Sequence, residues 1–257
     1  MKKITQWDLF LSFLKSFYIQ ASWNFEKMQN IGLTFVLSSI INKLYSDSEK
    51  RNKVYARYIS FFNIHPYTAS FFIGMAIKIE ENIAQGKDIP ENFEKTKKII
   101  SSPLSVIGDL FFWETLKPCA SLIGILIMLF FNLNLLGILT TFFIFNIPHF
   151  YVRIFGIWKG YYLEKQVVNY IKKMQFPKMS YFIGNLTLFL CGIAIVFFAL
   201  DGNFTKLYFN LGEFSIVFIF IAITLIFSYI LKKILSVTMI AFIFTGLGII
   251  VNHFLQR

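Results

Sequence analysis

Three long uncharged segments constrain the fold of this chain more than any other feature of its sequence. They are residues 181–200, 214–231 and 237–255, each 18 to 20 residues long and strongly apolar. An α-helix rises 1.5 Å per residue, so each segment would extend about 27–30 Å, which matches the hydrocarbon thickness of a bilayer. We therefore predict three transmembrane helices within residues 181–257.

The composition supports a membrane protein. Hydrophobic residues make up 56% of the chain and charged residues 15%, whereas soluble domains average about 45–50% and about 25%. The net charge is +11, but the basic residues lie between apolar segments, which is typical of cytoplasmic loops and not of a nucleic-acid site. We expect an all-α integral membrane protein in the lipid bilayer, with transmembrane helices, re-entrant helical hairpins and an N-terminal amphipathic helix, and no nucleic-acid partner.

Charge asymmetry orients the apolar segments. Residues 149–180 are rich in lysine, so we expect this basic segment on the cytoplasmic side. The loop 201–213 carries two acidic residues against one lysine and should face outside. Lys232 and Lys233 should be cytoplasmic, which leaves the C-terminus outside.

Residues 1–20 begin basic and then become apolar. Large apolar side chains recur at helical spacing, at Ile4, Trp7, Leu11, Leu14 and Tyr18. This spacing predicts an amphipathic helix with one apolar face. Asp8 and Lys15 interrupt the apolar sequence, so we expect a helix that lies in the membrane interface and not a signal peptide.

Residues 21–118 mix polar and apolar segments and predict short helices, some of them re-entrant. Ser22 is placed to cap a helix running towards residue 45. The apolar stretch 67–77 is too short to cross a bilayer, so we expect it to be re-entrant or packed against other helices. Glu80 and Glu81 follow it. Adjacent helical residues do not face each other, which favours a solvated helix end over a catalytic pair.

Residues 119–148 are apolar and uncharged, but Asn132, Asn134 and Gly137 interrupt them. A single crossing would put the basic segments before and after this stretch on opposite sides of the membrane. A helical hairpin that enters and returns on one side avoids this, provided that protein or a cavity covers the irregular backbone. The alternative is one long tilted helix whose asparagines face other helices.

The sequence shows no catalytic or metal-binding pattern. Cys119 and Cys191 have neither a second cysteine nor a histidine at ligand spacing, so we expect buried free thiols, no metal and no cofactor. A lipid-modifying enzyme would need a nucleophile–base pair or a metal cluster, and three scattered histidines supply neither. We expect no catalytic residues in this chain.

The segment SSPLSVIGDLFFWETLKP places carboxylates in apolar surroundings. Pro103 and Gly108 are expected to bend the chain, with Trp113 on the same helical face as Asp109 and Glu114 on another side. A charge at bilayer depth costs at least about 2.5–3.5 kcal/mol, so Asp109 should face a bundle interior or an aqueous cavity. A carboxylate beside an aromatic ring suits a sugar. Capping of the local turn is the alternative role.

Two earlier segments carry similar residues. SWNFEKMQN holds Asn24 and Glu26 beside a tryptophan, and FFNIHP holds Asn63 and His65. We take these four, together with the aspartate and tryptophan above, as candidate substrate-binding residues. The alternative roles for Glu26 are an intrahelical charge and contact with a partner subunit.

Five motifs carry a resemblance to a known family. SWNFEKMQNIG, FFNIHP, IEENIAQG, PLSVIGDLFFWETLKP and KGYYLEKQVV occur in that order. Over nearly its whole length the chain resembles the IID subunit of mannose-family sugar phosphotransferase permeases. The resemblance implies a IIC–IID complex in a bacterial cell membrane, forming a trimer of such pairs. That complex would move a hexose or amino sugar inward while cytoplasmic IIA and IIB subunits phosphorylate it. Since the soluble subunits carry the phosphoryl group, His65 is expected in a packed or polar network.

The chain departs from the family pattern at three positions. Ser102, Val106 and Glu164 stand where glycines are usual, and glycine would permit close backbone packing or a strained turn. These changes keep open an alternative function, that of a degenerate subunit retained for membrane assembly without transport.

Overall fold

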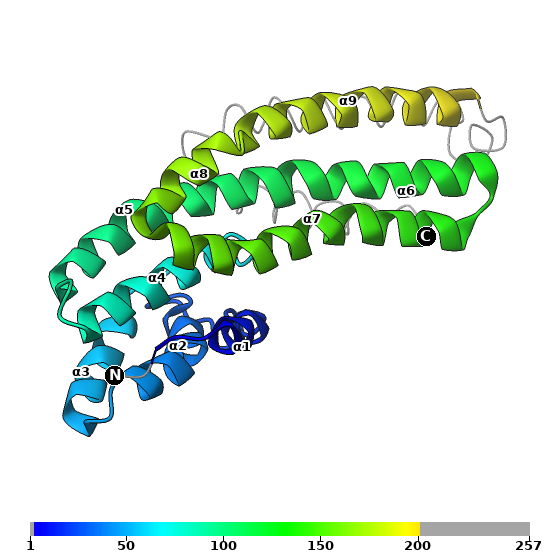
Figure 1. The fold of residues 1–257 in the computed structure, drawn as a ribbon. Helices are drawn as coiled ribbons and strands as arrows, with labels where there is room; N and C mark the ends of the chain where they lie inside the picture. Colours follow the sequence, from blue (N-terminus) through cyan, green and yellow to red (C-terminus); the bar gives the residue numbers. More distant parts are fainter. Residues whose placement is uncertain (1–2, 201–257) are drawn as a thin grey trace, which may run out of the picture. The chain divides into compact units, whose positions relative to one another are not determined.

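A computed structural model of the chain describes residues 3–200. The chain divides into two units after Gly192, and the first is the subject of this section. The elements of residues 3–200 are α1 (Gln6–Ser16), α2 (Asn30–Leu44), α3 (Ser48–Tyr58), α4 (Ala69–Ala84), α5 (Pro90–Gly108), the π-helix η1 (Asp109–Leu116), α6 (Lys117–Phe131), α7 (Asn134–Leu163), the 3-10 turn η2 (Glu164–Gln166), α8 (Val167–Lys173) and α9 (Phe176–Leu200), which continues past Gly192. Figure 1 labels the α-helices. The expected all-α class is confirmed. The helices expected at 214–231 and 237–255 lie outside the described residues.

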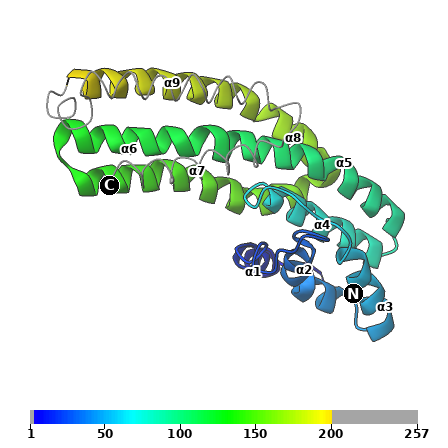
Figure 2. The same cartoon turned by 180° about the vertical axis from the view of Figure 1, so that it is seen from behind.

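The short apolar helix α4 is the centre of the core. It packs along α7 (Figure 2), and glycines on both helices permit this approach: a Cβ at Gly74 would lie 2.0 Å from the Ile157 carbonyl oxygen, and one at Gly160 would lie 2.3 Å from that of Phe71. Phe72 and Met75 on α4 are fully buried. Of the two expectations for residues 67–77, packing against other helices is therefore confirmed.

Helix α1 has two apolar faces. Thr5 and Asp8 form a capping box that begins the helix. Leu9 and Phe13 are buried against the core. Of the face expected from the spacing, Trp7, Leu14 and Tyr18 are exposed, whereas Ile4, which precedes the helix, is buried. The helix is confirmed between residues 6 and 16, and its position in the membrane interface stays a proposal.

The helix expected to begin at Ser22 is wrong, because α2 begins only at Asn30. The backbone amide and carbonyl of Asn24 pair with those of Met28 at 3.1 and 2.9 Å. Met28 has φ 57°, a left-handed conformation that no regular α-helix contains. This tight turn replaces the first turns of the expected helix.

The chain reverses between α6 and α7. Asn132 ends α6 in the left-handed conformation, with φ 57° and ψ 26°, which asparagine tolerates at a helix C-terminus. The two helices then pack together, and a Cβ at Gly124 would lie 1.9 Å from Thr141 Oγ1. A helical hairpin is therefore present and the single tilted helix is wrong. The side of the membrane on which it returns stays a proposal.

Two helical stretches among residues 3–200 are long and apolar enough to cross a membrane, and the second is interrupted at Glu164 and Gln175, which both have positive φ. They are Lys95–Phe131 and Asn134–Ala194, and the second contains most of the segment expected at 181–200. The bend expected at Pro103 and Gly108 stays a prediction, since proline and π-helical turns both kink helices without ending them. Pro103 lies inside α5, which passes directly into the π-helix η1, so the widened turn replaces a break in the helix.

Candidate functional site

Hydrogen bonds join the first two motif segments. The backbone N–H of buried Gln29 donates to the Phe62 carbonyl at 2.8 Å, and its side-chain Oε1 accepts from the backbone N–H of Ile64 at 3.2 Å. The Asn30 side chain donates to the Ile59 carbonyl at 2.9 Å. These contacts satisfy backbone groups that no helix uses, and they fix the segment that carries the predicted residues Asn63 and His65.

The two predicted residues of the first motif have different surroundings. Asn24 Oδ1 accepts from the Lys27 backbone N–H at 2.8 Å, and its Nδ2 donates to Asn30 Oδ1 at 2.9 Å, so Asn24 fixes the turn. Glu26 has 81% of its side chain exposed and pairs with Lys27 at 3.5 Å. Both residues line a groove of about 880 Å³ beside α2 and α3. The structure does not bring them to the other predicted residues.

The second and third motif segments meet directly. Ser105 Oγ donates to the Asn63 carbonyl at 3.0 Å, and Thr68 Oγ1 donates to the Leu104 carbonyl at 2.9 Å. Asn63 itself has an exposed side chain. The contacts tie α5 to the FFNIHP segment just before the π-helix begins.

His65 lies at the centre of this junction and is 3% exposed. Its ring stacks on Phe112, with centroids 5.4 Å apart, and meets the Trp113 ring edge-on at 4.6 Å. Its Nδ1 accepts from the Tyr67 backbone N–H at 3.3 Å, which leaves the proton of a neutral ring on Nε2. Burial, and next the nearby Arg153 cation, lower the pKa of His65 to about 3. The expectation of a packed residue is therefore supported.

Asp109 and Trp113 occupy the first turns of the π-helix. Asp109 is partly buried, and no hydrogen bond or ion pair joins its carboxylate to another residue within 3–200, while Trp113 is 46% exposed. Glu114 lines a groove together with α9 residues such as Ser180 and Gly184, and neither Asp109 nor Trp113 is in that lining, in keeping with the expectation that Glu114 lies on another side of the helix. Glu114 lies close enough to Asp109 to act on it electrostatically. One carboxylate and one aromatic ring, Asp109 and Trp113, thus stand four residues apart at the start of η1.

A buried arginine beside the junction was not identified from the sequence. Arg153 is 4% exposed, and it donates to Ser16 Oγ and to the Pro66 carbonyl, both at 3.3 Å. Its guanidinium lies over the rings of Phe17, at 4.4 Å, and Tyr67, at 5.4 Å. Arg153 therefore connects α1, α7 and the turn that follows His65.

The sequence contains a signal for this arginine. Arg153 stands in the apolar stretch HFYVRIF, four residues after His149, so the two share a helical face. His149 is also buried, and its ring stacks on Tyr67 with centroids 3.7 Å apart. We had grouped both with the basic segment 149–180, but α7 continues as a packed helix to Leu163.

The expectation that Glu80 and Glu81 form a solvated helix end is wrong, since they are 1% and 2% exposed. Glu80 accepts hydrogen bonds from Tyr45, Arg57 and Tyr58 at 2.6 to 2.8 Å. Adjacent residues point in different directions on a helix, so each glutamate has its own set of partners. Among residues 3–200, no group of side chains has the composition of a metal site.

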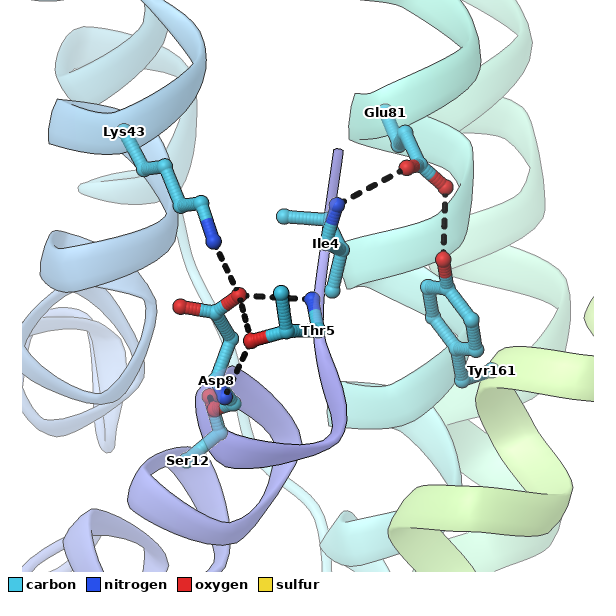
Figure 3. A network of polar contacts seen from close by, with 7 residues as sticks. All are labelled: Ile4, Thr5, Asp8, Ser12, Lys43, Glu81 and Tyr161. Atoms are coloured by element: carbon cyan, nitrogen blue, oxygen red, sulfur yellow. Dashed lines mark hydrogen bonds and ion pairs between the residues drawn. The ribbon is translucent and has the colours of Figure 1, made fainter. Parts of the chain in front are cut away.

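Glu81 belongs to a network that fixes the N-terminus (Figure 3). Its carboxylate accepts from the Ile4 backbone N–H at 3.2 Å and from the Tyr161 hydroxyl at 2.7 Å. On the other side of the chain, Asp8 pairs with Lys43 of α2. Burial raises the pKa of Glu81, but hydrogen bonds from Tyr161, Lys78 and Ile4 outweigh it and give a net lowering. The network is structural and holds α1 against α2, α4 and α7.

The three departures from the family pattern differ in their consequences. Ser102 and Val106 are exposed on α5, so neither side chain is crowded within the described part of the chain. Glu164 has φ 49° and ψ −128°, a conformation that favours glycine. Of these three positions, only Glu164 therefore has a strained backbone.

Comparison with known proteins decides the family. A family model described as the PTS system mannose/fructose/sorbose family IID component matches residues 3–254. The chain belongs to this IID family. It is 35% identical to the mannose-specific EIID component of Escherichia coli K12 over 62% of its own length and 56% of that protein. It is 26% identical to the sorbose-specific EIID component of Lacticaseibacillus casei over 96% and 93% of the two chains.

Solved structures agree with the family assignment. A structure of the mannose transporter ManYZ with microcin E492 superposes with a TM-score of 0.61, at 32% identity over 75% of this chain and 70% of that one. A second structure, described as a membrane protein, gives a TM-score of 0.72 at 26% identity over 96% of both chains. The chain thus spans little more than half of the E. coli IID relative but nearly all of this second structure.

Proposed function

We propose that this chain is the membrane-embedded IID subunit of a mannose-type, phosphoenolpyruvate-dependent sugar phosphotransferase permease. With a IIC subunit it forms the pathway for uptake of a hexose or amino sugar, and cytoplasmic IIA and IIB subunits phosphorylate the sugar. The names of its relatives, a mannose-specific and a sorbose-specific EIID component, support this class of substrate. The mannose transporter structure, which is a complex, supports assembly with other subunits.

The observation that carries the proposal is the meeting of the FFNIHP segment with α5 and η1 around His65. A packed junction delivers Asp109 and Trp113 to one region of the π-helix, where the carboxylate has no partner within the described chain. Such a carboxylate in an apolar helix requires a hydrogen-bond donor, which a sugar hydroxyl or a partner subunit supplies. π-Helical turns occur frequently at functional sites.

The candidate residues take different roles in this proposal. Asp109 accepts hydrogen bonds from sugar hydroxyls, and the exposed Trp113 ring covers an apolar sugar face. His65 holds the tryptophan in place. Asn24 positions its turn, whereas exposed Glu26 and Asn63 are available to the pathway or to IIC. Glu26 and Asn63 line two separate grooves. Neither residue contacts the sugar in this proposal.

The remaining expectations complete the proposal. The protein crosses the cell membrane of a bacterium several times, with the basic segment 149–180 inside and the C-terminus outside. The exposed face of α1 lies in the membrane interface, and IIC–IID pairs assemble as trimers. The non-transporting subunit loses support, because Ser102 and Val106 are exposed and not crowded.

Reconstitution in cells tests the function. The host is a bacterium that lacks its own mannose-family permease, and it expresses this chain with its IIC, IIA and IIB partners. The cells are then supplied with labelled hexoses and amino sugars. We expect labelled sugar phosphate only when all four are present, with omission of this chain as the control. A complex that assembles and reaches the membrane without accumulating any labelled sugar would instead identify a non-transporting assembly subunit.

A further inference from the structure

A polar groove lies outside the junction described above, between α5 and residues 60–63. Its volume is about 610 Å³. Two hydrogen bonds form its floor: buried Lys97 Nζ donates to Ser60 Oγ at 2.6 Å, and Ser105 Oγ donates to the Asn63 carbonyl at 3.0 Å. The groove is therefore a built feature of the fold and not a gap between loosely placed side chains.

The outer wall of the groove changes in polarity along the helix. Lys98, Ser102 and Val106 follow one another at intervals of four residues, and all three are exposed. Such residues lie on one face of a helix and about 6 Å apart along its axis. All three belong to the helical stretch Lys95–Phe131, which is long and apolar enough to cross a membrane. One face of α5 thus carries an ammonium group, then a hydroxyl, then an apolar side chain, over about 12 Å.

This order of groups matches the order of groups in a phospholipid. We propose that the groove binds one phospholipid with an anionic headgroup. Lys98 contacts the headgroup phosphate, Ser102 donates to an ester oxygen at the glycerol level, and the first acyl carbons lie between Val106 and Phe61. Val106 is 62% exposed and Phe61 57% exposed, so both offer apolar surface at that depth. Basic pockets between transmembrane helices are known to bind such headgroups.

The charges favour a lipid over a protein segment as the occupant. The described lining contains one exposed lysine, Lys98, and no carboxylate. An apolar helix of a partner would remove water from Lys98 without supplying an anion, which is costly. The phosphate group of a lipid supplies that anion. A small soluble phosphate would make few of the contacts described, because the other end of the groove is apolar.

The experiment measures lipid retention by the full chain. Protein from nanodiscs of equal phosphatidylglycerol and phosphatidylcholine should be released in a native mass spectrometer, and the bound lipids counted. We expect a preference for phosphatidylglycerol in the wild type and about a fivefold loss of that preference in Lys98→Gln, since one lysine near a membrane surface contributes about that factor. Lys50→Gln, which removes an exposed charge on α3, should keep the preference.

A second variant and a competitor complete the test. Val106→Asn should lower the retention of both lipids without changing their ratio, because it alters only the acyl end. Equal ratios in wild type and Lys98→Gln, or an equal fall in Lys50→Gln, would overturn the proposal. Displacement of the lipid by millimolar inorganic phosphate would also overturn it and indicate a soluble phosphate site. If the preference for phosphatidylglycerol were lost on assembly with the IIC subunit, protein would cover the groove. That result would also contradict the proposal.

Discussion

Gly108 lies directly against the side chain of His65. A Cβ built on Gly108 would stand 2.3 Å from the His65 Cβ and 2.4 Å from its Cγ. This contact joins two motif segments that are far apart in the sequence, and it leaves no room for any side chain at position 108. The approach fixes where the π-helix begins, and with it Asp109.

Gly108→Ala should therefore destabilise the junction. The added methyl group forces His65 or α5 to move, and overpacking of this kind typically costs about 1–3 kcal/mol. Thermal unfolding of the purified protein in detergent measures the effect. Gly184→Ala is the control, because the nearest atom to its Cβ is Thr115 Cγ2 at 4.0 Å. If the two variants unfolded at the same temperature, the close approach would be wrong.

His65 should make the folded protein sensitive to acid. Its pKa is about 3 when folded and about 6.5 in an unfolded chain. Between these values only the unfolded state binds the proton, so stability falls as the pH falls, by at most about 1.4 kcal/mol per pH unit. Melting temperatures at pH 7.5, 6.0 and 5.0 should decline more steeply in the wild type than in His65→Phe. Parallel declines would show that His65 is exposed or protonated in the fold.

Arg153 should hold α1 in place. Methionine at position 153 keeps an apolar side chain in the site but removes the hydrogen bonds to Ser16 and Pro66. A hydrogen bond from a charged group contributes about 1.5–3 kcal/mol, so amide hydrogens within residues 6–16 should exchange at least about tenfold faster in Arg153→Met. Lys159→Met, on the exposed side of the same helix, should leave them unchanged. Normal protection of α1 in Arg153→Met would contradict this role.

Glu164 should be a site where glycine stabilises the fold. A non-glycine residue with positive φ costs on the order of 1–3 kcal/mol, and glycine loses about 0.5–1 kcal/mol of this gain through its freedom in the unfolded chain. We expect Glu164→Gly to raise stability by about 1 kcal/mol in denaturant unfolding. Glu164→Ala removes the same carboxylate, but alanine does not tolerate positive φ as glycine does. This variant should therefore show no gain in stability. An equal gain from both would trace the effect to the charge instead.

The sequence predicted those elements whose structure depends on residues adjacent to one another in the chain. The reversal at Asn132 could be predicted because asparagine tolerates the left-handed conformation that ends α6. The burial of the stretch 67–77 followed from its length. By contrast, the turn at Met28 depends on pairing with Asn24 and Phe62, which involves a segment distant in sequence. Periodicity around Ser22 could not reveal that pairing.

The candidate site was only partly predictable for the same reason. Residue type identified His65 and Trp113, which do meet. The burial of Glu80 and Glu81 depends on tyrosines and basic residues from other helices, so their position at a polar helix end gave the wrong expectation. The net charge of residues 149–180 gives no sign that Arg153 is buried, whereas its apolar neighbours indicate a buried helix face.

The binding of sugar to Asp109→Asn tests the central claim most directly. Asparagine keeps the size and one acceptor oxygen but removes the charge, and a charge-assisted hydrogen bond contributes about 1.5–3 kcal/mol. In the purified complex with the IIC subunit, we predict that the dissociation constant for the transported sugar rises about tenfold to a hundredfold while the complex assembles normally. Unchanged sugar affinity together with failed assembly would contradict the account, because Asp109 would then fix the structure and not contact the substrate.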